Sequence, residues 1–86
     1  MNVREYSLPY YEEVLDFLAD SPSAREIIAF RPNRSAQERF SELLQRNRQH
    51  ELSRQEADEL DHYVQIERMM SLLKAKAYTR LDQEAE

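Results

Sequence analysis

The chain contains no glycine, and this absence limits its fold more than any other feature of the sequence. At a typical usage of ~7%, a chain of this length would contain about six glycines. Two-residue β-hairpin turns and phosphate-binding loops both need glycine at defined positions. The absence therefore argues against hairpin sheets and excludes glycine-rich nucleotide sites. The rest of the composition, which is rich in Ala, Leu, Glu, Gln and Arg, favours α-helix throughout.

The length and the residue content also limit the kind of protein. A chain of 86 residues forms one domain at most, and a domain this small is marginally stable alone. Because the chain has no cysteine, disulfides, zinc thiolate sites and thiol nucleophiles are excluded. No signal-peptide pattern follows Met1, and no run approaches the ~20 apolar residues of a membrane span. We therefore expect a cytoplasmic protein that does not enter a membrane.

Two short helices are predicted in the first third of the chain. Pro9 suits the first turn of a helix over 7–20, because its missing N–H has no partner to lose there. Ser21 is the candidate N-cap of a second helix over 21–32. Pro32 ends this helix, because the residue before a proline is pushed out of the α region.

A helical hairpin is predicted in the rest of the chain. The helices over 35–48 and 53–81 both begin with the capping-box pattern S-x-x-E, led by Ser35 and Ser53. The connection over 48–52 is short, so the two helices can pack antiparallel. We expect the last residues of the chain to fray.

The last helix is too long for the domain that contains it. At ~1.5 Å per residue it is about 42 Å long, whereas a compact chain of this size has a radius of gyration of about 12 Å. It carries a first apolar seam with the three-and-four spacing of coiled coils. This seam consists of Tyr63, Ile66, Met70, Leu73 and Ala77. A second apolar belt on another face consists of Leu60, Val64, Ala75, Tyr78, Met69 and Leu72.

Two arrangements would cover both apolar faces of this helix. In the first, the other helices of the same chain cover it, and the protein is a monomeric four-helix fold with a buried last helix. In the second, another chain covers part of it, and a symmetric dimer is the simplest case. We favour the dimer and assign its interface to the first seam, so we expect a homo-oligomer.

The residues that could carry catalysis or bind a metal are few. We interpret His50 as a solvated cap residue, and either Asn47 or His50 could take the left-handed conformation that ends the helix over 35–48. Glu59 and His62 have the E-x-x-H spacing of di-iron helical bundles. Further ligands would have to come from Glu38 and Glu42, which are better explained as a cap residue and as a residue off the apolar face. We therefore predict no catalytic residue, no metal site and no cofactor.

Charge is distributed along the chain in blocks. The net charges are −4 over 1–30, +3 over 31–50, −5 over 51–67, +4 over 68–81 and −3 over 82–86. These blocks are either solvated helix faces or surfaces that complement a charged partner, such as the basic cleft of another protein. The overall charge of −5 disfavours direct nucleic-acid binding.

The acidic and aromatic first third is the predicted partner-binding region. Aromatic rings beside carboxylates favour a core or a protein interface over base stacking, which needs cations nearby. We expect the following residues to contact a protein partner: Tyr10, Tyr11, Glu12, Glu13, Val14, Asp16, Phe17, Ile27, Ile28 and Phe30.

Five segments in their order along the chain carry a resemblance to a known group. They are "LPYYEEVLDFL", "EIIAFRP", "QERFSELLQRNR", "LSRQEADELDHYVQIE" and "LLKAKA". Over about residues 6 to 81 the chain resembles short all-helical bacterial proteins, frequent in cyanobacteria, that are often encoded beside small nucleases, including HNH-type ones. Those proteins are interpreted as antitoxin-like partners. The resemblance implies a binding protein that holds a nuclease inactive, and it offers no catalytic motif to transfer.

Together these observations predict an all-α fold in one domain, 1–86. It has short helices within 1–32, a helical hairpin over 35–81 and a frayed tail over 82–86. The predicted function is that of a non-catalytic, antitoxin-like inhibitor that associates with a small nuclease and neutralises it. The alternative is a structural or adaptor homo-oligomer with no inhibitory role.

Overall fold

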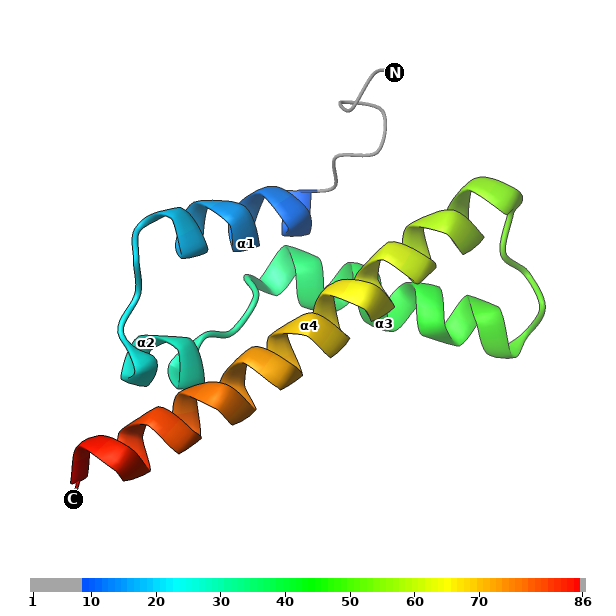
Figure 1. The fold of residues 1–86 in the computed structure, drawn as a ribbon. Helices are drawn as coiled ribbons and strands as arrows, with labels where there is room; N and C mark the ends of the chain where they lie inside the picture. Colours follow the sequence, from blue (N-terminus) through cyan, green and yellow to red (C-terminus); the bar gives the residue numbers. More distant parts are fainter. Residues whose placement is uncertain (1–8, 86) are drawn as a thin grey trace.

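The computed structural model describes residues 9–85 and, within that range, contains four α-helices and no strand (Figure 1). The helices are α1 Pro9–Ala19, α2 Ala24–Ala29, α3 Arg34–Arg48 and α4 Arg54–Ala85. The predicted all-α fold, with two short helices followed by a hairpin whose second helix is long, is confirmed. The first two residues of the predicted helix over 7–20 lie outside the described residues.

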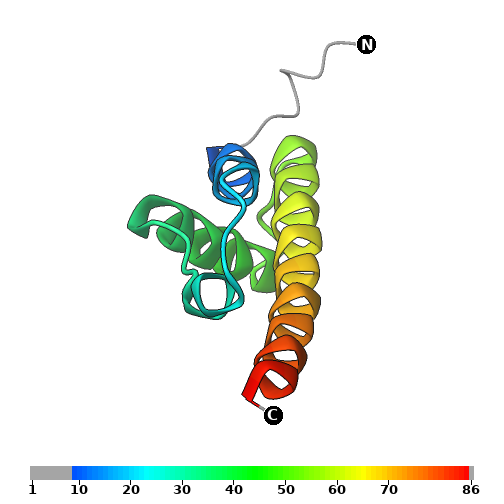
Figure 2. The same ribbon diagram turned by 60° about the vertical axis from the view of Figure 1, so that its left-hand side comes forward.

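Helix α4 sets the shape of the molecule. Its 32 residues correspond to about 48 Å at ~1.5 Å per residue, close to the longest extent of 50 Å. The other three helices all lie on one side of α4 (Figure 2). One side of the long helix is therefore covered by the chain itself, and the opposite side is open.

Three aromatic rings join α1, α3 and α4. The ring of Tyr63 lies between Tyr10 and Phe40, with both pairs of ring centroids 5.4 Å apart. The interplanar angles are 24° to Tyr10 and 7° to Phe40, which is stacked geometry in the distance range that aromatic pairs prefer. Tyr10 and Tyr63 keep only 2% and 3% of their surface exposed. This three-ring stack is the point where the long helix meets two of its three neighbours.

The rest of the core extends from this stack. Its buried members are Tyr10, Val14, Ala36, Leu43, Leu60, Tyr63, Ile66 and Met70. Towards the C-terminal half of α4, Phe17 packs on Phe30 with the ring centroids 4.5 Å apart. The Lys74 ammonium donates a hydrogen bond of 2.8 Å to the carbonyl of Phe30. The end of α2 is therefore held against both α1 and α4.

The predicted dimer seam faces the inside of the single chain. Tyr63, Ile66, Met70 and Ala77 are between 3% and 5% exposed, and Leu73 packs against the core. The assignment of this seam to a dimer interface is therefore wrong, because α1, α2 and α3 already cover it. The spacing identified a real apolar stripe, but spacing does not say which element covers a stripe.

Salt bridges fix the register between α3 and α4. The Arg39 guanidinium donates two hydrogen bonds of 2.8 Å to Glu59, and it also pairs with Glu42. Arg46 pairs with Glu56 at 2.9 Å. The hydrogen bond to Glu59 is the main cause that raises the pKa of Arg39 above its ordinary value. The positive block over 31–50 and the negative block over 51–67 thus complement each other within the chain.

The start of α4 has the predicted capping box. The Ser53 hydroxyl accepts a hydrogen bond from the Glu56 N–H, and the Glu56 carboxylate accepts one from the Ser53 N–H, both at 3.1 Å. His50 has a φ of 58°, so of the two predicted candidates, Asn47 and His50, it is His50 that takes the left-handed conformation after α3. Helix α4 then continues to Ala85, and the residues at 82–85 that we expected to fray are helical. Their sequence, D-Q-E-A, contains no helix breaker.

Helices α2 and α3 begin at other caps than the predicted ones. Ser23, not Ser21, is the N-cap of α2, and it forms a complete capping box with Glu26. Asn33 is the N-cap of α3, because its side chain accepts the N–H of Ala36 at 2.9 Å. The predicted cap Ser35 lies inside that helix. In both places a second strong cap residue stands two positions away from the predicted one.

Replacement of Tyr63 by Ala should remove the centre of the core. We expect Tyr63→Ala to lower the free energy of unfolding by about 3–5 kcal/mol, because the loss of a large buried ring leaves a cavity. Urea titration followed by circular dichroism measures this loss. Tyr78→Ala, at a ring that is 58% exposed, is the matched control and should change the stability by no more than about 0.5 kcal/mol. Equal effects of the two variants would contradict the central place of Tyr63.

The charge of Glu56 should make the helical hairpin sensitive to acid. The hydrogen bond from the Ser53 backbone and the nearby Arg46 charge hold the pKa of Glu56 below its ordinary value of 4.5. The stabilisation is therefore present above that ordinary value and is lost as the pH falls through the lower folded-state pKa.

The variant Glu56→Gln tests this because Gln can still complete a capping box but carries no charge. We expect the variant to unfold more readily than the wild type at about pH 7, with the difference closing towards about pH 3. Thermal unfolding at the two pH values measures the difference. A gap that is the same at both pH values would show that the charge of Glu56 does not stabilise the fold.

Candidate protein-binding surface

The outer side of α1 carries an apolar row beside an acidic row. Residues four positions apart lie in line along a helix, so Tyr11, Leu15 and Ala19 form one row. The second row begins with Glu12 and Asp16 and leads to Asp20, which follows the last helical residue. We call these six residues the acidic α1 face; all six are exposed. Tyr11 and Leu15 have 42% and 49% of their surface exposed.

Two polar contacts hold the inner side of α1 in place. The Tyr10 hydroxyl donates a hydrogen bond of 2.6 Å to the Glu67 carboxylate on α4. Burial, followed by this hydrogen bond, raises the pKa of Tyr10 above its ordinary value of 10.0, so the hydroxyl remains a donor. The Glu13 carboxylate accepts the Asn33 N–H at 3.0 Å, which joins α1 to the start of α3. These contacts turn the acidic α1 face away from the core.

The structure divides the predicted partner-binding residues into three groups: exposed, buried and partly buried. Tyr11, Glu12 and Asp16 belong to the acidic α1 face and are exposed. Tyr10 and Val14 are 2% and 1% exposed, so their prediction as partner contacts is wrong. The reason is that α1 is amphipathic, and the predicted range contained both of its sides.

The other predicted contacts are partly buried. Phe17 and Phe30 pack on each other, and Glu13 is occupied by the start of α3. Ile27 and Ile28 are half-buried on α2. The prediction did not include Leu15, although its position four residues after Tyr11 and one after the buried Val14 places it on the outer side.

A second exposed apolar surface lies on the open side of α4. Within the described residues, the large apolar side chains that are exposed lie on α1 and on the C-terminal half of α4. On α4 they are Met69, Leu72 and Tyr78, with 45%, 64% and 58% of their surface exposed. These three belong to the second apolar belt of the sequence, whereas Leu60 of the same belt is buried. The second belt, not the first seam, therefore leaves apolar surface uncovered.

The E-x-x-H motif does not assemble ligands around a metal. The Glu59 carboxylate accepts both hydrogen bonds from Arg39, and Glu38 pairs with Arg34 at 2.9 Å. His62 is half-buried on α4. Over residues 9–85, no three His, Cys, Asp or Glu side chains lie together in an arrangement that could hold a metal ion.

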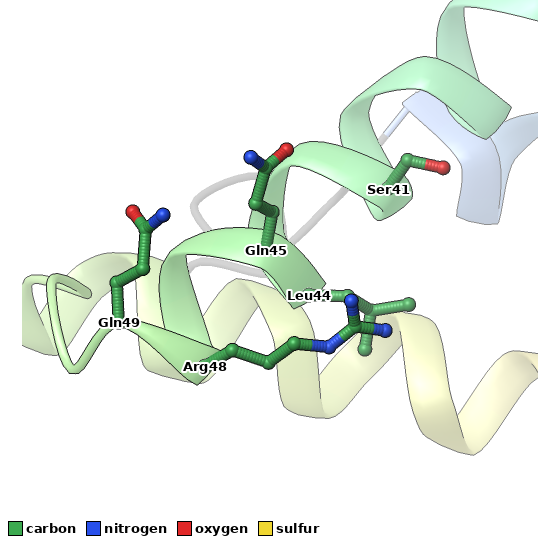
Figure 3. Close-up of a pocket in the computed structure, with 5 residues that line it drawn as sticks. All are labelled: Ser41, Leu44, Gln45, Arg48 and Gln49. Atoms are coloured by element: carbon green, nitrogen blue, oxygen red, sulfur yellow. The ribbon is translucent and has the colours of Figure 1, made fainter.

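Two of the hollows on the surface of the described residues are lined by hydrogen-bonding groups. One of about 460 Å³ lies along the outer side of α3 and its end (Figure 3). Its lining residues are Ser41, Leu44, Gln45, Arg48 and Gln49. In Figure 3 the side chains of Ser41, Gln45 and Gln49 point outward, away from α4. A hydroxyl, two amides and a guanidinium offer polar contacts to a partner, but none of these groups is a general base for the hydroxyl.

Another hollow of about 320 Å³ lies beside the three-ring stack. Tyr10 and Glu67 line it and are bonded to each other. Arg31 also lines it, and its guanidinium donates to the Phe30 carbonyl at 2.9 Å. Of these contacts, the hydrogen bond from Tyr10 to Glu67 joins α1 to α4, and that of Arg31 is local to the end of α2.

Comparisons with known proteins give no information on the function of these surfaces. No match was found with protein-family models, with curated proteins or with solved structures. Among the helices described, none combines the length and the apolar character needed to span a membrane. The acidic α1 face and the open side of α4 carry the exposed large apolar side chains of the described residues, so these two surfaces are the candidates for binding a partner.

Removal of the Tyr10 hydroxyl should loosen α1 without unfolding the hairpin. Tyr10→Phe keeps the stacked ring but removes the hydrogen bond to Glu67. We expect a loss of about 1.5 kcal/mol, at the low end for hydrogen bonds to charged groups because Glu67 is only partly buried. Local opening of α1 should then become roughly tenfold more frequent.

Amide hydrogen exchange followed residue by residue measures this opening. Tyr11→Phe, which removes a hydroxyl from the outer side of the same helix, is the matched control and should leave exchange in α1 unchanged. Equal acceleration in α1 and α3 would show that Tyr10 stabilises the whole fold and not the docking of α1.

Proposed function

We propose that this chain is a non-catalytic protein-binding module that acts as an antitoxin-like inhibitor of a small nuclease. The acidic α1 face is the observation that carries the proposal. It presents an apolar row and a carboxylate row side by side on a helix that is anchored from behind. No part of the proposed action requires chemistry by the chain itself.

The composition of this face fits a protein partner. Specific interfaces combine apolar contact at their centre with polar groups at the rim. Leu15 and Tyr11 supply the apolar contact, and Asp16 and Asp20 lie beside them. Neither α1 nor the turn after it contains a basic residue, so the surface is uniformly acidic. Such a surface steers the approach of a basic partner and disfavours an acidic one.

A small nuclease is a partner with the required charge. The cleft of a nuclease holds the phosphate backbone of its substrate and is therefore lined with cations. Insertion of an acidic helix face into that cleft would exclude the nucleic acid. The resemblance of the sequence segments to antitoxin-like proteins supports the same class of partner.

A second function is supported by the open side of α4. An exposed apolar surface on a helix that the chain leaves uncovered also fits a structural or adaptor homo-oligomer. Such a protein would need no nuclease, and its self-association would be its function. The two functions differ in whether a bound nuclease loses activity.

A cleavage assay tests the proposed inhibition. The chain is mixed with a small HNH-type nuclease, the class of partner that the resemblance implies, and cleavage of plasmid DNA is followed with and without the chain. We expect inhibition at a one-to-one ratio by the wild type. The variant Leu15→Arg with Asp16→Lys should raise the concentration needed for half inhibition at least about 100-fold, because it removes an apolar anchor and reverses a steering charge.

The control variants change the same kinds of residue elsewhere. Leu72→Arg and Asp61→Lys replace exposed residues on α4 and should leave inhibition unchanged. Failure of the wild-type chain to inhibit, or the same inhibition by the α1 variant, would overturn the proposal.

A further inference from the structure

The open side of α4 has a chemical pattern opposite to that of α1. Met69, Leu72, Ala75 and Tyr78 are each three residues apart, so they form a ridge that winds around the exposed side of the helix. Arg68, Leu72, Lys76 and Arg80 are each four residues apart and form a second, basic row. The two rows cross at Leu72, the most exposed of the large apolar side chains described. We call these seven residues the basic α4 face.

The charge of the basic α4 face is of one sign. The sequence from 68 to 81 contains four cations and no acidic residue. Lys74 does not belong to the face, because it donates to the Phe30 carbonyl on the covered side. Arg68, Lys76 and Arg80 are exposed. An occupant of this surface must therefore offer an apolar row together with carboxylates.

The acidic α1 face of another copy of the chain meets this requirement. It has an apolar row led by Tyr11 and Leu15 and an acidic row that includes Asp16 and Asp20. The lengths also match: both α1 and the segment from Met69 to Tyr78 have about ten to eleven residues, or ~15–17 Å at ~1.5 Å per residue. The chain's own α1 does not reach this surface, because it lies on the covered side of α4 (Figure 2).

We propose that the basic α4 face of one copy binds the acidic α1 face of a second copy. The two faces lie on different sides of the same molecule, so each copy uses them towards two different neighbours. The contact is therefore head to tail, and it extends into a chain or closes into a ring. A contact made by one short helix is small for a protein interface, so the association is weak and falls with salt.

This inference does not rest on the proposed inhibition of a nuclease. It does use the same α1 face, and a basic partner and a second copy therefore compete for α1. Purified chain alone tests the self-association, so its failure leaves the nuclease assay unaffected, and the reverse also holds.

Two variants with complementary defects test the contact. In the first, Leu15→Arg with Asp16→Arg blocks the α1 face and leaves the α4 face intact. In the second, Leu72→Asp with Lys76→Asp blocks the α4 face and leaves the α1 face intact. All four side chains are exposed, so we expect both variants to keep the helical content and the unfolding midpoint of the wild type.

The expected result is specific to a head-to-tail contact. Sedimentation of the wild type at low salt should give a mass that rises with concentration beyond that of one chain. Each variant alone should sediment as a monomer, with a dissociation constant raised at least about tenfold. The equimolar mixture should form a one-to-one pair that does not grow, because each variant supplies the face that the other lacks.

Three outcomes would overturn the proposal. They are a wild type that stays monomeric at about millimolar concentration in low salt, a mixture that stays monomeric, and either variant associating as the wild type does. A control variant with Asp58→Arg and Asp61→Arg, on the exposed N-terminal half of α4, should associate normally. Binding of monomeric wild type to vesicles of phosphatidylserine and phosphatidylcholine, lost on Leu72→Asp with Lys76→Asp, would instead assign the basic α4 face to a membrane surface.

Discussion

The position of Tyr63 between the rings of Tyr10 and Phe40 determines how the helices are arranged. Without glycine the chain has only helices to pack, and a helix buries surface through one stripe of side chains. The stack brings the stripes of α1, α3 and α4 to a single point. Arg39, one residue before Phe40, bonds to Glu59 one turn before Tyr63, so the ion pair and the stack fix the same register. The direction of the outer face of α1 follows from this arrangement.

Local sequence signals predicted the helices better than their exact starts. The capping box at Ser53 has no competing cap beside it, and it formed as predicted. Ser35 competes with Asn33, whose N–H is also held by Glu13 of α1. That tertiary hydrogen bond supports a helix start at Asn33, and no pattern near Ser35 in the sequence contains it. Cap positions were therefore predictable only where a single candidate stood at the helix start.

Apolar periodicity predicted which residues form stripes but not what covers them. Ile66 and Met70 have the spacing of a coiled coil, yet the short helices of the same chain bury them. On α1, Val14 is buried and its neighbour Leu15 is exposed, and the difference depends on which side meets Tyr63. A sequence gives the angle between two side chains on one helix, whereas the direction of the core comes from the other helices. The sequence could therefore assign the predicted contact residues to helices but not to the buried or the exposed side of each helix.

The charge blocks of the sequence lie in different environments in the folded chain. Some charges pair with each other between helices, and others stay exposed, where a binding partner would meet them. The two middle blocks meet through Arg39 and Arg46 with Glu56 and Glu59, so part of their charge is paired between α3 and α4. The exposed acidic residues of α1 lie with this helix on the covered side of α4 (Figure 2), whereas the exposed cations Arg68, Lys76 and Arg80 belong to α4 itself. The net charge of −5 is therefore the sum of acidic and basic regions that lie apart in the structure. Because such a separation orients molecules before they touch, the proposed association with a basic partner or with a second copy should weaken as the ionic strength rises.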